Sequence, residues 1–236
     1  MALVTKIKAL YGFFKLLRDP SQLDEVFVLA DELARPEVIE PMVSQLRRQS
    51  VAVSRSLDER HRLGAIDLDA LRQLPAGTLG RAFADHMVAN DLDPAALPTL
   101  EANDANSYFI AHAYETHDIW HVVTGFATDV AGELGLQAFY MAQLPGRLST
   151  LLLGLGFLNT LLFHFEDGER RMRAIVRGWL LGKRARQMFG IRWDEKWEIP
   201  LAEVRQNLSV DFSHVDNEIS GPRTTRGIGE SPAHAA

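Results

Sequence analysis

Residues 117 to 133 read HDIWHVVTGFATDVAGE, and this stretch decides how the chain folds. It opens with two histidines four residues apart, His117 and His121, which a helix projects from one face. It ends with Glu133, twelve residues after His121, which is about 18 Å further along a straight helix. Two glycines lie between the ends, and glycine tolerates backbone angles that other residues resist. We therefore predict a helix break between Val122 and Glu133, because a continuous helix would carry Glu133 away from the histidines.

A Glu133 that folds back would join a set of metal ligands. Asp118 lies three residues before His121, roughly 60° around a helix, so its carboxylate can reach the edge of the same site. Two neutral imidazoles with one or two carboxylates suit a divalent zinc, iron or manganese ion. The same histidine pair is also compatible with ordinary hydrogen bonds to Glu115 or Asp118. From the residues alone, both interpretations stay open.

Outward from this stretch, the dominant period is helical. The expected helices span residues 3–17, 21–33, a third that starts between Pro36 and Pro41 and continues over 42–53, then 79–87, 104–134 with the break described above, 145–163, 167–189 and 201–208, with a short segment at 193–197. Residues 54–78 are polar and broken, and no alternating strand, internal repeat or domain linker is recognisable. We expect one all-α domain, a helical bundle of residues 1–213. A disordered tail rich in Gly, Pro, Ser and Thr is expected over residues 214–236.

The composition is that of a folded globular protein. The chain has 236 residues, of which 47% are hydrophobic and 24% charged, enough for one domain with a substantial core. The formal net charge of −6 argues against nucleic acid as a partner. The chain has no cysteine, which excludes disulfides, thiolate metal sites and a cysteine nucleophile.

Neither a membrane span nor an export signal is expected. No apolar run reaches the roughly 20 residues that cross a bilayer. The N-terminus lacks the apolar core and small-residue cleavage site of a secretory signal. We therefore expect the mature chain to begin near Met1 and to stay on the cytosolic side.

The segment that follows Gly168 has the pattern of a basic amphipathic helix. Its apolar residues at core-facing spacing are Met172, Ile175, Val176, Trp179 and Leu180, and its arginines, mostly off that face, are Arg170, Arg171, Arg173, Arg177 and Arg184. Basic amphipathic helices can rest on anionic membrane surfaces, although a solvated charged face is the commoner case. The segment predicts reversible, peripheral membrane association.

Four blocks of the sequence resemble the Coq-four family of ubiquinone (coenzyme Q) biosynthesis proteins. The central block, Thr116 to Gly125, has the pattern His-Asp-x-x-His, which a glutamate follows after eleven residues. Gly132 to Phe139 resembles the next block, Leu74 to Arg81 an upstream block, and Trp193 to Leu208 the C-terminal motif. The chain departs from the family at His112-Ala113-Tyr114, where members usually carry Arg and Tyr. This difference suggests a divergent bacterial member that binds a different ligand.

The resemblance implies an all-α fold and a divalent metal ion, either zinc, iron or manganese. By position, the family's metal ligands and catalytic residues become His117, Asp118, His121 and Glu133. The implied activity is metal-dependent removal of the carboxyl group from a polyprenylated hydroxybenzoate-type precursor, with hydroxylation of the same ring carbon. The alternative is a non-catalytic, lipid-binding scaffold of the ubiquinone biosynthetic complex with a structural metal ion. A third possibility is an all-α interaction protein without a metal.

The same resemblance implies partners and a location. The partners are a polyprenylated quinone precursor or another isoprenoid lipid, other ubiquinone biosynthesis proteins and the membrane surface. The oligomeric state stays open, and the apolar helices are compatible with a homodimer. The location is cytoplasmic and peripheral, on the inner face of the bacterial cell membrane.

An isoprenoid tail needs an apolar channel, and the helix after Pro145 supplies candidates. They are Leu151, Leu152, Leu153, Leu155, Phe157, Leu158, Leu161 and Leu162, with Gly154 and Gly156 leaving room for a tail or a neighbouring helix. A fully buried core helix accounts for the same pattern, and the two interpretations are compatible.

Overall fold

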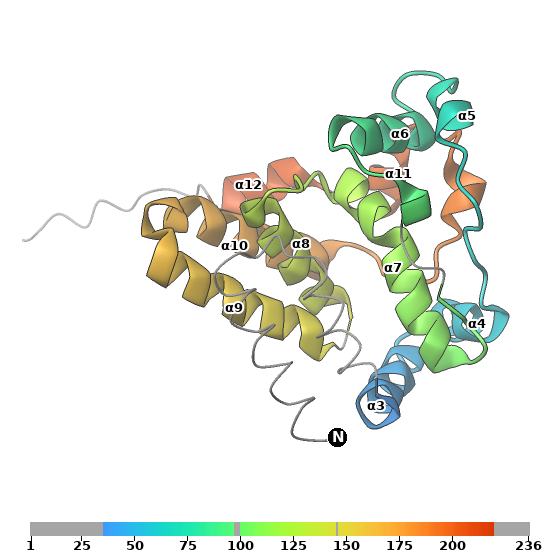
Figure 1. Cartoon of the computed structure of the whole chain (residues 1–236), viewed down its shortest axis with the longest axis horizontal. Helices are drawn as coiled ribbons and strands as arrows, with labels where there is room; N and C mark the ends of the chain where they lie inside the picture. Colours follow the sequence, from blue (N-terminus) through green and yellow to red (C-terminus); the bar gives the residue numbers. More distant parts are fainter. Residues whose placement is uncertain (1–34, 97–99, 145, 220–236) are drawn as a thin grey trace, which may run out of the picture.

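The computed structural model describes residues 35–96, 100–144 and 146–219 (Figure 1). Within these ranges the regular secondary structure is helical without any strand, and Thr78 and Pro200 form an isolated bridge. The all-α fold class is therefore confirmed. The helices are α3 Pro36–Arg47, α4 Val51–Glu59, α5 Leu68–Arg72, α6 Leu79–Ala89, α7 Ala105–Thr124, α8 Val130–Gln143, α9 Arg147–Phe163, α10 Gly168–Arg184, α11 Leu201–Asn207 and α12 Phe212–Ile219. Short 3-10 helices are η1 Pro94–Ala96, η2 Phe165–Asp167 and η3 Trp193–Lys196.

The helices form two groups that meet at the connection between α7 and α8. Helix α7 contacts α3 and α4 near one end and α6 and α11 near the other (Figure 1). Helix α8 packs against α9 and α10, and α12 lies on α10. The turn that joins α7 to α8 therefore lies where the two groups of helices meet.

Glycines set the close packing of α8 against α10. A Cβ atom added to Gly178 of α10 would lie 1.9 Å from the backbone oxygen of Gly135 on α8. One turn later, a Cβ atom on Gly182 would lie 2.9 Å from the backbone oxygen of Phe139. Because backbone atoms cannot move aside as flexible side chains do, these positions exclude any larger residue.

Large aromatic side chains fill the core between the two groups. Trp120 of α7 and Phe139 of α8 are completely buried, and their rings meet edge to face with centroids 5.7 Å apart. Aromatic pairs favour this geometry. The contact fixes α8 relative to α7 and therefore holds the residues on their facing sides at constant separation.

The predicted helix that starts between Pro36 and Pro41 is present as α3, but its predicted continuation to Val53 is wrong, because the structure has two helices there. Helix α3 ends at Arg47, and Ser50 begins α4 by accepting a hydrogen bond from the N–H of Val53 at 3.1 Å. Serine at an N-cap satisfies a backbone donor that the new helix leaves free. Helix α4 then continues to Glu59, inside the segment expected to be broken.

Helix α10 is shorter and oriented differently from the prediction. It ends at Arg184 rather than near residue 189, because Ala185 is extended and the N–H of Met188 bonds to the buried Gln143 Oε1 at 3.0 Å. Its residues that face α8 and the core include Gly178, Leu181 and Gly182, as described above.

The predicted apolar and basic faces of α10 are therefore corrected. Met172, Val176 and Trp179, expected to face the core, are exposed, whereas Arg171 is buried. All five arginines have carboxylate partners. These pairs are Arg170 with Asp129 and Asp167, Arg171 with Asp167, Arg173 with Glu169, Arg177 with Asp216, and Arg184 with Glu218. The cationic face that would attract anionic lipid is thus largely neutralised within the fold.

The predicted boundary of the tail lies too early. Helix α12, Phe212–Ile219, crosses the boundary at residue 213 and buries Val215 completely. The rest of the tail and the expected helices 3–17 and 21–33 lie outside the described residues. In the part of the chain that the structure describes, no helix is long and apolar enough to cross a membrane.

Candidate metal centre

The connection between α7 and α8 brings the predicted ligands together. Helix α7 ends at Thr124, and Gly125 follows with φ +68°, a left-handed conformation that glycine adopts without strain. Asp129 begins α8 by accepting a hydrogen bond from the N–H of Gly132 at 2.8 Å. The predicted break is therefore present, and it returns Glu133, in the first turn of α8, to the side of α7.

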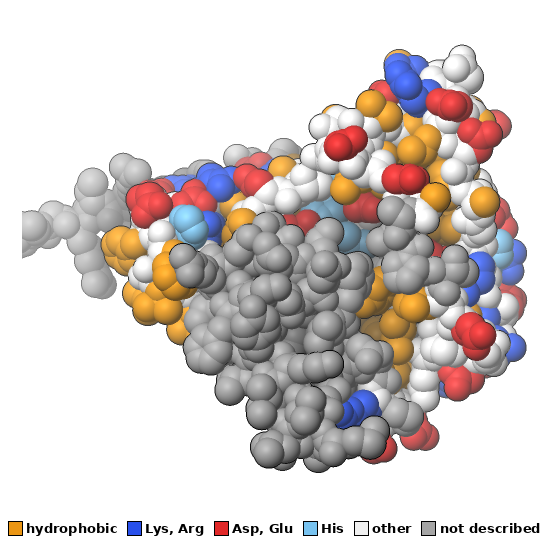
Figure 2. All heavy atoms as spheres, viewed as in Figure 1, with side chains coloured by type: hydrophobic (Ala, Val, Ile, Leu, Met, Phe, Trp, Pro, Cys, Tyr) orange, Lys and Arg blue, Asp and Glu red, His pale blue; other side chains and the backbone are white. Residues whose placement is uncertain are grey.

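Two imidazoles and a carboxylate converge across this connection. His121 Nε2 lies 3.2 Å from His117 Nε2 and 3.0 Å from Glu133 Oε1. Glu133 Oε2 lies 3.8 Å from His117 Nε2. His117, Asp118 and His121 each offer one ligand atom, and these atoms all lie within 4.8 Å of one another, so the three form a candidate metal-binding group. Figure 2 shows histidine and acidic side chains together near the middle of this face.

The hydrogen bonds of His121 indicate what lies between its Nε2 atom and the Glu133 carboxylate. Its Nδ1 lies 3.0 Å from the carbonyl oxygen of Phe126, which can only accept, so Nδ1 carries a hydrogen. In the neutral ring, Nε2 is then an acceptor that faces the Glu133 carboxylate, which is also an acceptor. Two acceptors 3.0 Å apart require a positive charge between them, either a proton or a metal ion.

The pKa values of the cluster follow from the same contacts. Burial lowers the pKa of His121, but the hydrogen bond and charge of Glu133 outweigh burial and raise it above 6.5. For Glu133, burial raises the pKa, and the hydrogen bond from His121 with the nearby imidazoles lowers it below 4.5. Burial lowers the pKa of His117, which Glu133 opposes only in part. Glu133 is therefore anionic near neutral pH, as a metal ligand must be.

Tyr140 and Trp120 support the ring of His117. The Tyr140 hydroxyl lies 3.4 Å from His117 Nδ1, and the two rings are nearly parallel at 6°. Tyr140 stacks in turn on the buried indole of Trp120, with centroids 4.4 Å apart. Burial raises the pKa of Tyr140 well above 10, so its phenol stays protonated. His117 Nδ1 thus has a polar neighbour in the Tyr140 hydroxyl, which is the usual arrangement around an imidazole that binds a metal through Nε2.

The donor set fits a divalent ion. Neutral nitrogen donors and carboxylate oxygens are the ligands that zinc, iron and manganese share. The Asp118 carboxylate is partly exposed and has no hydrogen-bond partner within the described ranges, so it is free to bind an ion. The side chains of His117 and Glu133 are 33% and 39% exposed, whereas that of His121 is 1% exposed. The cluster therefore has one closed side and one side open to solvent.

Three further residues shape the centre and were not identified from the sequence. The carbonyl of Phe126 orients His121, and backbone acceptors leave no sequence signal. Tyr140 lies seven residues after Glu133, two helical turns along the same face, so the spacing could have identified it. His86 of α6 stacks on His121, but it lies far away in sequence, and no local pattern connects the two.

The departure from the family pattern at His112 lies away from this cluster. His112 is buried, and its Nε2 accepts a hydrogen bond from the N–H of Gly190 at 3.0 Å. Its Nδ1 lies 3.4 Å from the hydroxyl of Tyr108. Burial lowers the pKa of His112 to about 3. His112 therefore links α7 to the segment that follows α10.

The C-terminal motif also acts through this end of α7. Arg205 of α11 donates to the carbonyls of Val123 at 2.9 Å and Val122 at 2.8 Å, and its guanidinium lies 4.9 Å from the ring centroid of Phe212. A cation at a helix C-terminus satisfies free carbonyls and stabilises the helix dipole. Arg205 thus holds the end of α7 at the turn that places Glu133.

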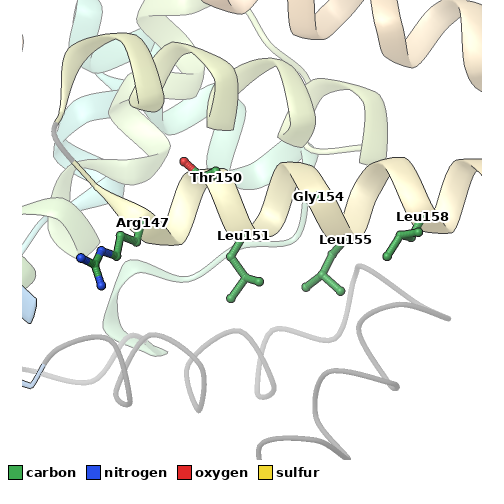
Figure 3. Close-up of a pocket in the computed structure, with 6 residues that line it drawn as sticks. All are labelled: Arg147, Thr150, Leu151, Gly154, Leu155 and Leu158. Carbon is green, nitrogen blue, oxygen red and sulfur yellow. The ribbon is translucent and has the colours of Figure 1, made fainter.

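An apolar pocket of about 510 Å³ lies along α9. In Figure 3, Leu151, Leu155 and Leu158 project from one side of the helix, and Arg147 lies at its beginning. Gly156 faces α8 instead, since a Cβ atom added there would lie 2.2 Å from a methyl carbon of Leu134. The apolar residues of α9 are thus divided among the pocket, the core and the surface.

The chain is similar to known proteins over most of its length. Residues 5–213 match the family described as "Coenzyme Q (ubiquinone) biosynthesis protein Coq4". A relative from Bos taurus, "Ubiquinone biosynthesis protein COQ4 homolog, mitochondrial", is 28% identical over 200 residues, which are 82% of this chain and 73% of that protein. The corresponding protein of Yarrowia lipolytica is 27% identical over 199 residues, 82% of this chain and 74% of that protein.

A solved structure agrees with the family match. The crystal structure of a proposed ubiquinone biosynthesis protein from Nostoc punctiforme superposes with a TM-score of 0.75 and 32% sequence identity, over 87% of this chain and 98% of that chain. The matched residues include the turn between α7 and α8, the four predicted ligands and the α11 motif. The chain belongs to the Coq4 family of coenzyme Q (ubiquinone) biosynthesis proteins.

Proposed function

We propose that this ubiquinone biosynthesis protein is a metal-dependent enzyme that acts on a polyprenylated hydroxybenzoate-type precursor. It would remove the ring carboxyl group as carbon dioxide and place a hydroxyl group on the same carbon. This replacement adds one oxygen atom, so dioxygen would supply that atom and a two-electron donor would reduce the other oxygen atom to water. The observation that carries the proposal is the convergence of His117, His121 and Glu133 on one point across the turn between α7 and α8.

In this proposal, His117, Asp118, His121 and Glu133 hold the ion. A divalent ion bound there would polarise the carboxylate or phenol oxygen of the substrate. Phe126 keeps His121 in the tautomer that presents a free Nε2, and Tyr140 fixes the ring of His117. The chain's own residues therefore supply binding and orientation.

The exposure of the cluster favours an enzyme over a scaffold with a structural ion. Structural zinc sites are closed by four protein ligands, whereas catalytic sites leave a position for water or substrate. Here His117 and Glu133 are about one-third exposed, and Asp118 is partly exposed as well. An ion that accepts more than four ligands, as iron and manganese do, would keep a position on this solvent side, where a substrate oxygen could bind without displacing any of the four protein ligands.

The apolar pocket on α9 is our candidate for the isoprenoid tail, and other ubiquinone biosynthesis proteins are the expected partners. Leu151, Leu155 and Leu158 offer apolar surface along the helix, and no atom of the described residues lies within 4 Å of a Cβ atom added to Gly154. Burying each CH₂ group of a tail would contribute about 0.8 kcal/mol.

The metal site is tested by elemental analysis of the purified protein beside its His121→Ala and Glu133→Ala variants. We expect about one equivalent of a divalent metal in the wild type and a strong loss in both variants, since each removes a ligand. His164→Ala is the matched control, because this exposed histidine lies at the end of α9, outside the cluster. Unchanged metal content in both ligand variants would refute the site.

The reaction is tested with purified, metal-loaded protein and a short-chain prenylated hydroxybenzoate under dioxygen with a reductant. The expected product has lost the carboxyl group and gained a hydroxyl group, which mass spectrometry detects with the release of labelled carbon dioxide from a carboxyl-labelled substrate. Metal binding without any turnover would favour the scaffold alternative.

A further inference from the structure

His86 lies beside the candidate ligands, although it belongs to none of the sequence blocks that contain them. It comes from α6, and its ring stacks on that of His121 with centroids 5.8 Å apart and an angle of 21° between the planes. The two rings come from different helices, α6 and α7, which contact each other. A third imidazole thus lies over His121, the buried member of the candidate ligands.

Asn90 determines which nitrogen of His86 carries a hydrogen. Asn90 Nδ2 donates to the backbone oxygen of His86 at 2.8 Å, and because a carbonyl only accepts, the orientation of this amide is fixed. Its Oδ1 accepts a hydrogen bond from the Thr128 hydroxyl at 2.7 Å, which agrees with this orientation of the amide. Nδ2 then also faces His86 Nδ1 at 3.5 Å, so Nδ1 is the acceptor and Nε2 carries the hydrogen.

This hydrogen has no acceptor within the described residues. His86 Nε2 is buried and makes no hydrogen bond there. A buried donor without an acceptor is unfavourable, and such groups in folded proteins usually await water, an ion or a ligand. The electrostatic neighbours of His86 are the four candidate ligands Asp118, His117, His121 and Glu133. The His86 ring is therefore close enough to the candidate ligands to interact with their charges.

We propose that His86 is an additional binding residue of this centre and donates a hydrogen bond from Nε2 to an oxygen of the bound ligand. The inference rests on the proposed function, which supplies an aromatic carboxylate or phenol as that ligand. A metal ion cannot be the partner, because it requires a lone pair. An oxygen anion beside the ion accepts the hydrogen, and a ligand without this oxygen leaves the donor unpaired.

The connection from Thr128 through Asn90 gives His86 a fixed orientation. Thr128 belongs to the turn that returns Glu133 to α7, so one turn positions both a candidate ligand and the hydrogen-bond donor. Stacking on His121 restricts the ring from its other side. A donor held in this way loses little conformational entropy when it binds a ligand.

The test uses protein loaded with Co²⁺, whose visible absorption reports on the ligands of the ion, and para-hydroxybenzoate as a soluble probe. His86→Phe keeps an aromatic ring on His121 and removes the donor, His86→Gln returns an N–H near the same position, and His164→Phe is the control for a surface histidine. We expect His86→Phe to weaken probe binding about tenfold, because a hydrogen bond to a charged group is lost. His86→Gln should recover part of the affinity, and His164→Phe should behave as wild type.

The affinity for Co²⁺ and the spectrum without probe should stay unchanged in both His86 variants. If His86 only held the ligands in place, its replacement would change both. Equal probe affinity in His86→Phe and wild type, a wild type that holds Co²⁺ without responding to the probe, or a changed spectrum without probe would each overturn the inference. A wild type that does not bind Co²⁺ would instead overturn the proposed function itself.

Discussion

At the scale of single residues, the centre depends on which hydrogen each ring nitrogen carries. The Phe126 carbonyl assigns the hydrogen of the neutral His121 ring to Nδ1, so in that form the lone pair of Nε2 faces Glu133. Tyr140 contacts the outer nitrogen of His117. These neighbours decide whether the imidazoles present lone pairs to an ion, and neither contact is visible in the ligand pattern itself.

Tyr140→Phe tests this support for His117. We expect metal affinity to fall about tenfold, because neighbours of ligating histidines typically contribute 10–100-fold and this contact is long at 3.4 Å. Stability should change little, since the stack on Trp120 remains. Tyr108→Phe is the matched control, because its hydroxyl lies at the same distance from His112, which is no candidate ligand. Isothermal titration with Zn²⁺ measures both, and equal losses would contradict the role of Tyr140.

His112 predicts how stability depends on pH. Its pKa is about 3 in the folded protein because burial disfavours the charged ring, against about 6.5 when unfolded. Between these values the unfolded chain binds a proton that the folded protein does not, so stability falls as pH falls, by up to about 1.4 kcal/mol per pH unit.

Denaturant unfolding between pH 7 and pH 4 measures this slope. His112→Gln can still accept from Gly190 without titrating, so we expect a shallower slope than in the wild type. The exposed His164→Gln is the control. A slope that stays the same in His112→Gln would show that other groups cause the acid sensitivity.

At the scale of helices, glycines distinguish surfaces that pack from surfaces that stay free. Gly178 allows the backbones of α10 and α8 to touch, and Gly156 admits Leu134 between α9 and α8. Gly154, only two residues away from Gly156, faces none of the residues that the structure describes. The same residue type therefore has opposite roles within one helix.

Gly178→Ala and Gly154→Ala form a matched pair. Both replace a helix-interior glycine, which alone stabilises by up to about 1 kcal/mol. In Gly178→Ala the new methyl group would lie 1.9 Å from a backbone oxygen, so α8 and α10 must separate and we expect a loss of roughly 1–3 kcal/mol or more. In Gly154→Ala no described residue obstructs the methyl group, so the gain should remain. Thermal unfolding checks both, and equal effects would contradict this packing.

At the scale of the whole molecule, an exposed apolar surface lies where α9 ends. It consists of Phe157, Leu158, Leu161, Leu162, Phe163 and Phe165. Figure 2 shows hydrophobic side chains at this end of the molecule. Contiguous apolar surface of this kind marks sites that bind proteins or membranes. Because the arginines of α10 are paired, we attribute the proposed membrane association to this surface and not to basic residues.

Flotation with liposomes tests this origin. We expect the wild type to float with the vesicles and to remain bound when salt is raised, since apolar burial is not screened. The double variant with Leu161→Glu and Phe165→Glu should lose at least tenfold in binding, because each buried apolar side chain contributes about 1.5–3 kcal/mol. Val51→Glu, at an isolated exposed position, is the control. Release by salt, or flotation of the double variant, would contradict the prediction.

The helical period determined much of this protein by itself. It predicted the all-α class and the start of α6 at Leu79, where the hydroxyl of Thr78 accepts a hydrogen bond from the N–H of Arg81. It also predicted the break after α7, because Gly125 tolerates the left-handed turn and a rigid helix would separate the two ends of the motif. These are local properties, which neighbouring residues decide.

Only the tertiary structure decided which faces are buried and which distant groups meet. The face of α10 was predicted wrongly because its buried side is made of small residues such as Gly178, which a hydrophobic pattern does not recognise, while Met172 and Trp179 are exposed. His86 contacts His121, and Arg205 contacts the end of α7, from helices far away in the chain. Such contacts depend on how helices pack, and packing is set by the shape of whole surfaces rather than by the order of residues along one of them.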